Sequence, residues 1–440
     1  MAAVSLSAPS PLWLAALPGL LAVWLWAVTD LQRFVLFAVL ATMVLPQALL
    51  TPGGTQVALA DLLLLVALGA WLVATAAGAS TGRLPVRNGL IIAALLFVAV
   101  NVESLAWSDR PAETVKFTIQ LFEIVVIFPL VFASLPRSLD VIERGFVTFI
   151  AVTCGLALVF MAGLAPQIPG APGKNTVGTF LAAGVVMAYA LTLAERSFRF
   201  KLLLYTALAV DVIGLVATTS RGSVLGALVA LVAMSFLLHR RRAITVGIVL
   251  VLGVGFVAIH GTDSRDERSI AINGSYDTRT VRAYSFRNAR EKIEERPFLG
   301  SGAGTYQDFI QELELPLPDP NNMFLLTWAE IGLVGLLALL CLLWQYARLL
   351  LAVRHLPGAY STTAVGAGCV TLSLLVHFQF DVTWTRGTSS LGFAMMGLML
   401  AVQRLSPASA DERAPDRVRS QPAIGMPASL PRRVGSSARV

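Results

Sequence analysis

Long apolar runs are the feature of this sequence that most constrains its fold. Thirteen runs occur, most of them close to the roughly 17–25 residues that cross a bilayer as one helix. Hydrophobic residues make up 56% of the chain and charged residues only 13%. Lipid has to cover apolar surface that a water-soluble core cannot bury. The sequence therefore predicts an all-α fold, a polytopic membrane helical bundle of 12–13 transmembrane helices with one large extracytoplasmic loop.

Basic residues in the short connections predict the orientation of these helices. If the connection 194–201 is placed in the cytoplasm, the short cytoplasmic connections hold thirteen basic residues and the opposite ones hold five. Because cytoplasmic loops are enriched in Lys and Arg, this places the long connection outside the cytoplasm. The predicted parts are transmembrane helices 1–10 in 1–260, a large periplasmic loop with short helices in 261–320, C-terminal transmembrane helices in 321–403 and a disordered cytoplasmic tail in 404–440.

Composition also excludes some functions. The net charge of +7 is spread over short clusters between the apolar runs, so no nucleic acid is expected as a partner. The three cysteines lie inside apolar runs without CxxC spacing, and we expect them to be small buried hydrophobic residues. No metal site and no cofactor is predicted.

The long loop is expected to be ordered, and ordered long loops are usually functional. Asp277 or Thr278 can cap a helix that stops before Pro297. A glycine-rich turn, GSGAG, follows this helix. It is weak evidence for a dinucleotide site because no strand precedes it. The expected apolar stripe of the helix consists of Val281, Phe286, Ala289 and Ile293.

Arginines on the extracytoplasmic side are candidate phosphate ligands, since their planar fork binds phosphate oxygens bidentately. Arg221 in TTSRGS stands at the outer end of an apolar run, and its alternative role is that of an interfacial anchor. Arg287 and Arg290 each precede a glutamate by four positions, which is typical of surface pairs on a helix. Arg282 has no acidic partner at that spacing on its C-terminal side, which favours it as a ligand-binding residue.

Polar residues at the starts of two apolar runs are further candidates. Asn321 and Asn322 open one run, and Lys174 and Asn175 open another on the same side. Helix capping explains an Asn at such a position without any function, and a lone loop lysine is usually only solvated.

The ordered set TSRG, a long loop with R-x-x-x-aromatic, RPFLGSGAGTY, PNN and E-x-G-L-V-G resembles the O-antigen ligase and Wzy-type O-antigen and exopolysaccharide polymerase superfamily. The strongest match covers about 218–336, and Asp61 and GKNTVG extend it weakly toward the N-terminus. Two positions differ from the family pattern. Asn321 stands where the family usually has His, and Phe286 stands where it usually has Trp.

The resemblance implies an enzyme of the bacterial inner membrane, a metal-independent glycosyltransferase that works on the periplasmic face. Its donor would be an undecaprenyl-pyrophosphate-linked oligosaccharide, and its glycan acceptor another lipid-linked repeat unit in a polymerase or lipid A core in a ligase. Membrane lipid and proteins of polysaccharide assembly are expected partners. Arg221 and Arg282 fall on the functional arginines of the family, which are thought to hold the pyrophosphate, and Asn321 completes the expected catalytic set. The expected substrate-binding residues are Lys174, Asn175, Arg287, Asn322 and Asp319.

Asn321 favours a polymerase over a ligase, because an amide can orient a hydroxyl group but cannot take its proton. Asp319, another loop carboxylate or the leaving pyrophosphate could accept that proton instead, and the sequence leaves these alternatives open. A polysaccharide or lipid transporter or flippase is the alternative of another class. Transporters more often show internal repeats and charged or broken helices near mid-membrane, and neither is evident in these runs. Glycosidase chemistry is a weaker alternative, since nothing fixes the separation of two carboxylates.

Overall fold

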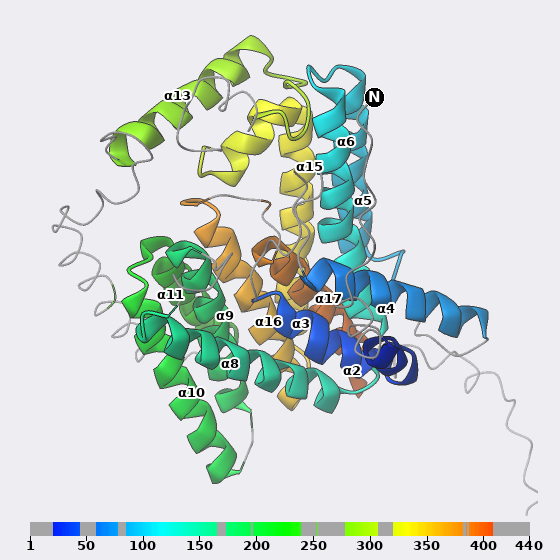
Figure 1. Ribbon diagram of the computed structural model, residues 1–440, viewed down its shortest axis with the longest axis vertical. Coiled ribbons are helices and arrows are strands. Elements are labelled where there is room, and N and C mark those ends of the chain that lie inside the picture. The colour runs from blue at the N-terminus through cyan, green and yellow to red at the C-terminus, as the bar shows by residue number, and fades with distance from the viewer. Residues whose placement is uncertain are drawn as a thin grey trace, which may run out of the picture.

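In the computed structural model, helices joined by turns make up the regular structure, and no strand occurs in the described residues (Figure 1). These residues are 21–44, 59–77, 85–164, 173–194, 197–238, 253, 278–306, 320–381, 384 and 387–407. The elements are α2 (Leu31–Arg33), η1 (Phe34–Val39), α3 (Leu40–Thr42), α4 (Leu59–Ala76), α5 (Gly89–Glu103), η3 (Ser104–Ala106), α6 (Pro111–Phe122), η4 (Glu123–Ile127), α7 (Phe128–Ser134), α8 (Leu139–Met161), α9 (Lys174–Leu193), α10 (Phe198–Ala217), α11 (Arg221–Leu238), α13 (Thr278–Glu295), α15 (Met323–Val353), α16 (Gly358–His377) and α17 (Thr388–Leu405).

Within this described part, eight helices are long and apolar enough to cross a bilayer. A ninth span results if Leu21–Thr29 and Leu31–Thr42, which meet at 112°, are counted as one broken span. The prediction of an all-α polytopic membrane protein is therefore confirmed. The apolar run at 243–260 lies largely outside the described residues, as does most of 404–440, so the total of 12–13 helices and the disordered tail stay predictions.

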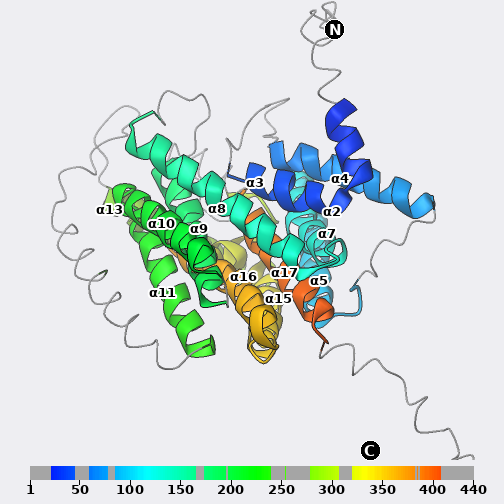
Figure 2. The ribbon, with the colours of Figure 1, turned by 90° about the horizontal axis from the view of Figure 1, so that it is seen from below.

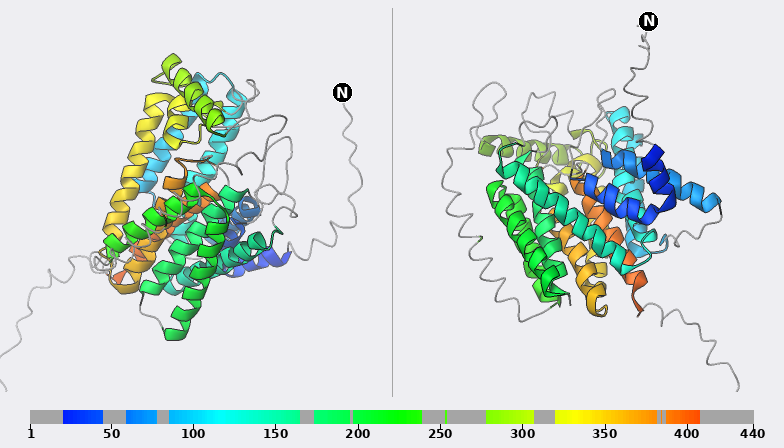
Figure 3. Two further views of the ribbon diagram at one scale, coloured as in Figure 1. Left: turned by 90° about the vertical axis from the view of Figure 1, so that its left-hand side faces the viewer. Right: turned by 60° about the horizontal axis from the view of Figure 1, so that its bottom comes forward.

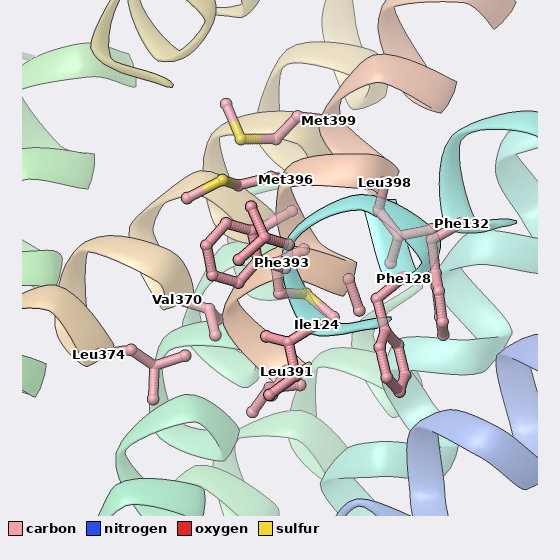
Figure 4. Close-up of a cluster of buried hydrophobic side chains, with 14 of the residues drawn as sticks. Ile124, Phe128, Phe132, Val370, Leu374, Leu391, Phe393, Met396, Leu398 and Met399 are labelled. Atoms are coloured by element: carbon pink, nitrogen blue, oxygen red, sulfur yellow. The ribbon is translucent and has the colours of Figure 1, made fainter. Parts of the chain in front are cut away.

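The centre of the bundle is formed by α9, α16 and α17. Inside the molecule, 83% of the α9 span is buried, against 22% of the α10 span, whose exposed leucines and isoleucine are suited to face lipid. α16 packs against α9, α11 and α17, and α8 runs across α9 and α10 (Figures 2 and 3). Aromatic, aliphatic and methionine side chains from η4, α7, α16 and α17 fill the space between these helices (Figure 4).

Small residues let α11 approach α16 closely. A Cβ atom on Gly226 would lie 2.5 Å from the Ser373 carbonyl oxygen, and one on Gly222 would lie 3.0 Å from His377 Nδ1. Close backbone approach through a G-x-x-x-G step is common between membrane helices. The two glycines thus bring the end of α16 to the start of α11.

A buried carboxylate lies between α8, α9 and α10. Asp211 on α10 is fully buried, and its Oδ2 accepts a hydrogen bond of 2.9 Å from Thr153 Oγ1 on α8. Gly184 on α9 leaves room for this pair, because a Cβ atom there would overlap both polar side chains. The interior of the apolar run 200–218 therefore holds one buried carboxylate, which is paired across two helices.

We expect Thr153→Val to destabilise the protein by about 1–3 kcal/mol, because it leaves a buried carboxylate oxygen without its donor. Thermal unfolding in detergent measures the effect. The matched control is Thr148→Val in the same helix, since Thr148 is only half-buried and donates to the Arg144 carbonyl oxygen of its own helix at 3.0 Å. Equal melting temperatures for the two variants would contradict a stabilising role of the Thr153–Asp211 pair.

A kink in α15 receives the glycine-rich turn of the long loop. Ile331 and Gly332 leave helical geometry, with φ of −122° and 65°, respectively, which frees main-chain groups on both sides of the kink. Four hydrogen bonds replace those of the helix, and they are Ser301 N to Ala329 O (3.3 Å), Gly302 N to Glu330 O (2.8 Å), Leu333 N to Pro297 O (2.9 Å) and Val334 N to Phe298 O (3.4 Å). We call this set of four bonds the loop joint.

The loop joint is braced from the turn between α5 and α6. Trp107 Nε1 donates to the Leu299 carbonyl oxygen at 2.9 Å, and Arg296 forms an ion pair of 3.0 Å with Asp109. The connection that carries α13 is therefore fixed to two neighbouring parts of the bundle.

α13 spans the segment of the loop that was predicted to be a helix, but its apolar stripe was placed partly wrongly. Phe286 is 44% exposed, whereas Ser285 and Asn288 are buried beside Ala289. The reason is a polar contact across the loop, in which Tyr306 Oη donates to the Ser285 carbonyl oxygen at 2.9 Å. On the buried face of α13, Ser285 therefore takes the place expected for Phe286, while Ala289 and Ile293 pack against the core as expected.

Candidate functional site

Arg221 is the first residue of α11, and a tight turn from α10 positions it. Thr218 caps α10, Thr219 adopts a left-handed conformation with φ of 54°, and Ser220 N bonds back to Thr218 Oγ1 at 3.3 Å. The Arg221 side chain lies at an exposed position, while Ser220 and Ser223 on either side are buried. The start of α11 thus places an exposed cation next to two buried serine side chains.

The start of α9 joins the start of α11 through Ser223. Ser223 Oγ lies 3.3 Å from the Asn175 carbonyl oxygen, 3.3 Å from Thr179 Oγ1 and 2.9 Å from Ser220 Oγ. Gly178 makes this approach feasible, because a Cβ atom there would lie 2.9 Å from Ser223 Oγ. Asn175 and Arg221, two of the predicted site residues, are therefore brought together. Lys174 is exposed next to Asn175.

The end of α16 completes this polar cluster. His377 is buried, with Nδ1 lying 3.3 Å from Ser223 Oγ and Nε2 lying 3.2 Å from Asp381 Oδ2. In the neutral imidazole one nitrogen donates and the other accepts. The carboxylate can only accept, so Nε2–H donates to Asp381.

The start of α15 lies against the same end of α16. Asn322 caps α15, and its Oδ1 accepts from the main-chain N–H groups of Phe324 and Leu325, both at 3.0 Å. Its Nδ2 donates to Gln379 Oε1 at 3.2 Å. Asn321 is buried, with a left-handed φ of 50°. The helix-capping interpretation of Asn322 is confirmed, and its amide also contacts the turn after His377.

The chain beyond Asp381 is held by Trp384. Its ring stacks on Phe97 and Phe393, with centroids 5.5 Å and 6.2 Å away, and its carbonyl oxygen accepts from Gln120 Nε2 at 3.0 Å. Asp381 is therefore fixed on one side by His377 and followed closely by a buried aromatic anchor.

α13 carries the predicted loop arginines and lies at the end of the molecule where α15 begins (Figure 1). Arg287 is exposed, 3.9 Å from Glu291 Oε1 and 4.5 Å from the centroid of the Tyr284 ring. The predicted pair of Arg290 with Glu294 is also present, at 2.7 Å. Arg282 belongs to α13, but its side chain lies outside the described residues, as does Asp319.

Four members of the cluster were missed in the sequence, namely Ser223, His377, Gln379 and Asp381. The available signal was HFQFD, in which His and Asp are four residues apart and so share one helical face. It was overlooked because it forms the polar end of an otherwise apolar run.

We call Asn175, Arg221, Ser223, Asn322, His377, Gln379 and Asp381 the cap cluster. It combines an arginine, a carboxylate and the starts of three helices, α9, α11 and α15. Helix N-termini and arginine both favour anionic ligands. The arrangement is suited to an anionic substrate that also carries hydroxyl groups.

Comparison with known proteins identifies part of this arrangement. Residues 204–340 match the model of a protein family described as O-antigen ligase. The match begins in α10, includes Arg221, α13 and Asn322, and ends in α15 before His377. A search of curated proteins gave no match. The resemblance seen in the sequence motifs is thereby confirmed, since residues 204–340 of this multi-pass helical membrane protein are similar to the O-antigen ligase family.

Proposed function

We propose that this protein transfers glycan from an undecaprenyl-pyrophosphate-linked oligosaccharide to a hydroxyl group at the periplasmic face of the bacterial inner membrane. The observation that carries the proposal is the position of Arg221. Arg221 stands at the start of α11, within the residues that match the family model. The contacts of the cap cluster join this helix start to the starts of α9 and α15.

Arg221 would act on the leaving group. As the bond between the sugar C1 and the phosphate oxygen breaks, negative charge grows on the pyrophosphate, and a guanidinium stabilises that charge without losing its own proton. Arg282 on α13 would be the second such cation. Lys174, Asn175, Arg287, Asn322 and Asp319 would hold sugar or phosphate groups around these two arginines.

We place polymerisation of lipid-linked repeat units first, because Asn321 stands where the ligases of the family usually have a histidine. Two observations support transfer to lipid A core as the second candidate. The matching family is described as O-antigen ligase, and His377 brings an imidazole into the cap cluster from another part of the chain.

Incubation of the purified protein with an undecaprenyl-pyrophosphate oligosaccharide as the only substrate should separate these candidates. A polymerase is expected to produce a ladder of longer lipid-linked chains, which gel electrophoresis resolves. Product that forms only after lipid A core is added would reverse the order of the two candidates. Absence of product under both conditions would contradict glycan transfer itself.

A further inference from the structure

The turn that follows α13 presents apolar side chains at the protein surface. Phe298 is 65% exposed and Leu299 is 47% exposed, although both lie beside the well-packed loop joint. We call residues 297–299 the apolar turn. Its main-chain carbonyl groups are held by α15 and by Trp107, so the turn is fixed in place while its side chains stay uncovered. Exposed apolar patches of this kind usually mark an interaction surface.

The apolar turn continues the lipid-facing surface of α15. Val334 N on α15 donates to the Phe298 carbonyl oxygen at 3.4 Å, and Val334 is itself exposed. Leu337 and Trp344 are exposed farther along the same side of this helix. Because α15 is long and apolar enough to cross a bilayer, lipid has to cover these side chains. The apolar turn adds to the end of that surface.

The length of α15 indicates how deep the apolar turn lies. α15 has 31 residues, which gives a length of about 46 Å, so it exceeds the roughly 30 Å of the hydrocarbon core. The roughly 20 residues that cross the core reach from Val353 back to about Val334, which follows the kink at Gly332 closely. Counting from Arg348 instead would place the kink deeper. The apolar turn is therefore at the boundary of the hydrocarbon core.

The neighbours of the apolar turn suit this depth. Trp107, which follows the α5 span, and Trp328 on α15 each donate their Nε1–H group to a carbonyl oxygen of the turn at 2.9 Å. Tryptophan is enriched at membrane–water interfaces, because its ring is apolar and its N–H group needs a partner. Directly before the turn, Arg296 forms an exposed ion pair with Asp109. Apolar, aromatic and charged groups thus occur together, as at the boundary between hydrocarbon and water.

We propose that the apolar turn is inserted into the bilayer interface on the side of α13, with Phe298 and Leu299 among the acyl chains next to the lipid headgroups. The partner is the bilayer and not another protein, because the turn is continuous with a surface that lipid already covers. Insertion keeps the end of α13 at the level of the lipid phosphates, where the pyrophosphate of a lipid-linked donor also lies. This last consequence, unlike the insertion, rests on the proposed glycan transfer.

Photo-crosslinking of the full-length protein in liposomes of phosphatidylethanolamine and phosphatidylglycerol tests the insertion. Benzoylphenylalanine replaces one residue at a time, namely Phe298, the lipid-facing Leu337 as positive reference, or Glu291 on the exposed, charged side of α13 as negative reference. Mass spectrometry then measures the yield of phospholipid adducts. We expect the yield at position 298 to be similar to that at position 337 and several-fold higher than that at position 291.

Two exposed phenylalanines supply a matched pair for a second measurement. Phe298→Asp brings a charge into the bilayer interface and should lower the melting temperature in lipid nanodiscs by a few degrees. Phe286→Asp changes an exposed phenylalanine on α13 in the same way and should leave the melting temperature nearly unchanged. Phe298→Leu should melt like the wild type, because lipid requires only an apolar side chain.

Each outcome decides the inference. An adduct yield at position 298 as low as that at position 291 would place the turn in water and overturn the inference, and so would a cross-link to a second copy of the chain in place of lipid. Equal destabilisation by Phe298→Leu and Phe298→Asp would indicate specific packing within the protein and would also contradict it. Lipid adducts form without glycan transfer, so an inactive protein that gives them would refute the proposed function alone.

Discussion

Arg221→Lys is expected to lower the rate of glycan transfer about 10²–10³-fold, the usual loss when one donor to a developing negative charge is removed. Lysine keeps the positive charge but loses the planar fork that binds two phosphate oxygens at once. Because Arg221 is exposed at the start of α11, the melting temperature should change little. Transfer from a lipid-linked donor, measured per mole of folded protein, checks this expectation.

Arg290→Lys is the matched control for this experiment. Arg290 is an exposed arginine on α13 paired with Glu294, so its replacement should leave transfer nearly unchanged. Arg282→Lys should resemble Arg221→Lys if both arginines hold the pyrophosphate. Near-normal glycan transfer by Arg221→Lys would contradict the assignment of Arg221 as a residue that binds the pyrophosphate of the glycan donor.

Gly332→Ala is expected to leave little folded protein. Gly332 has φ of 65° and ψ of −167°, and a non-glycine residue in a sparsely populated region of this kind costs about 1–3 kcal/mol. A Cβ atom would also overlap the main chain of Phe298, which belongs to the loop joint. Size-exclusion chromatography and thermal unfolding in detergent should show loss of the monodisperse protein.

Gly155→Ala supplies the contrast. Gly155 lies inside α8, where a Cβ atom would meet nothing within 4 Å. Alanine in a helix interior is favoured over glycine by about 0.5–1 kcal/mol, so this variant should melt at or slightly above the wild-type temperature. Normal folding of Gly332→Ala would show that the loop joint tolerates a side chain at the kink.

The helical fold was predictable because apolar runs of membrane length admit few other structures. The loop joint could not be predicted from the sequence, although its residues belong to motifs that were recognised there. GSGAG and E-x-G-L-V-G were read as separate signals, but they contact each other through main-chain groups across the loop. Side-chain patterns carry no information on such bonds, which explains why the sequence did not reveal the structural role of Gly332.

The candidate site was predictable where polar residues begin a helix. Arg221, Asn175 and Asn322 were found in this way, and the structure joins them through Ser223 and the end of α16. His377 and Asp381 were missed because tertiary packing brings them to the other members, and they lie beyond the stretch that resembles the family.

The loop joint also limits how a substrate can enter. Lifting the glycine-rich turn from α15 would expose four main-chain groups at a kink inside a membrane helix. Each such group left without a partner in an apolar environment costs several kcal/mol. The turn is therefore expected to stay docked on α15, and under the proposed glycan transfer a lipid-linked donor would reach the cap cluster without displacing it.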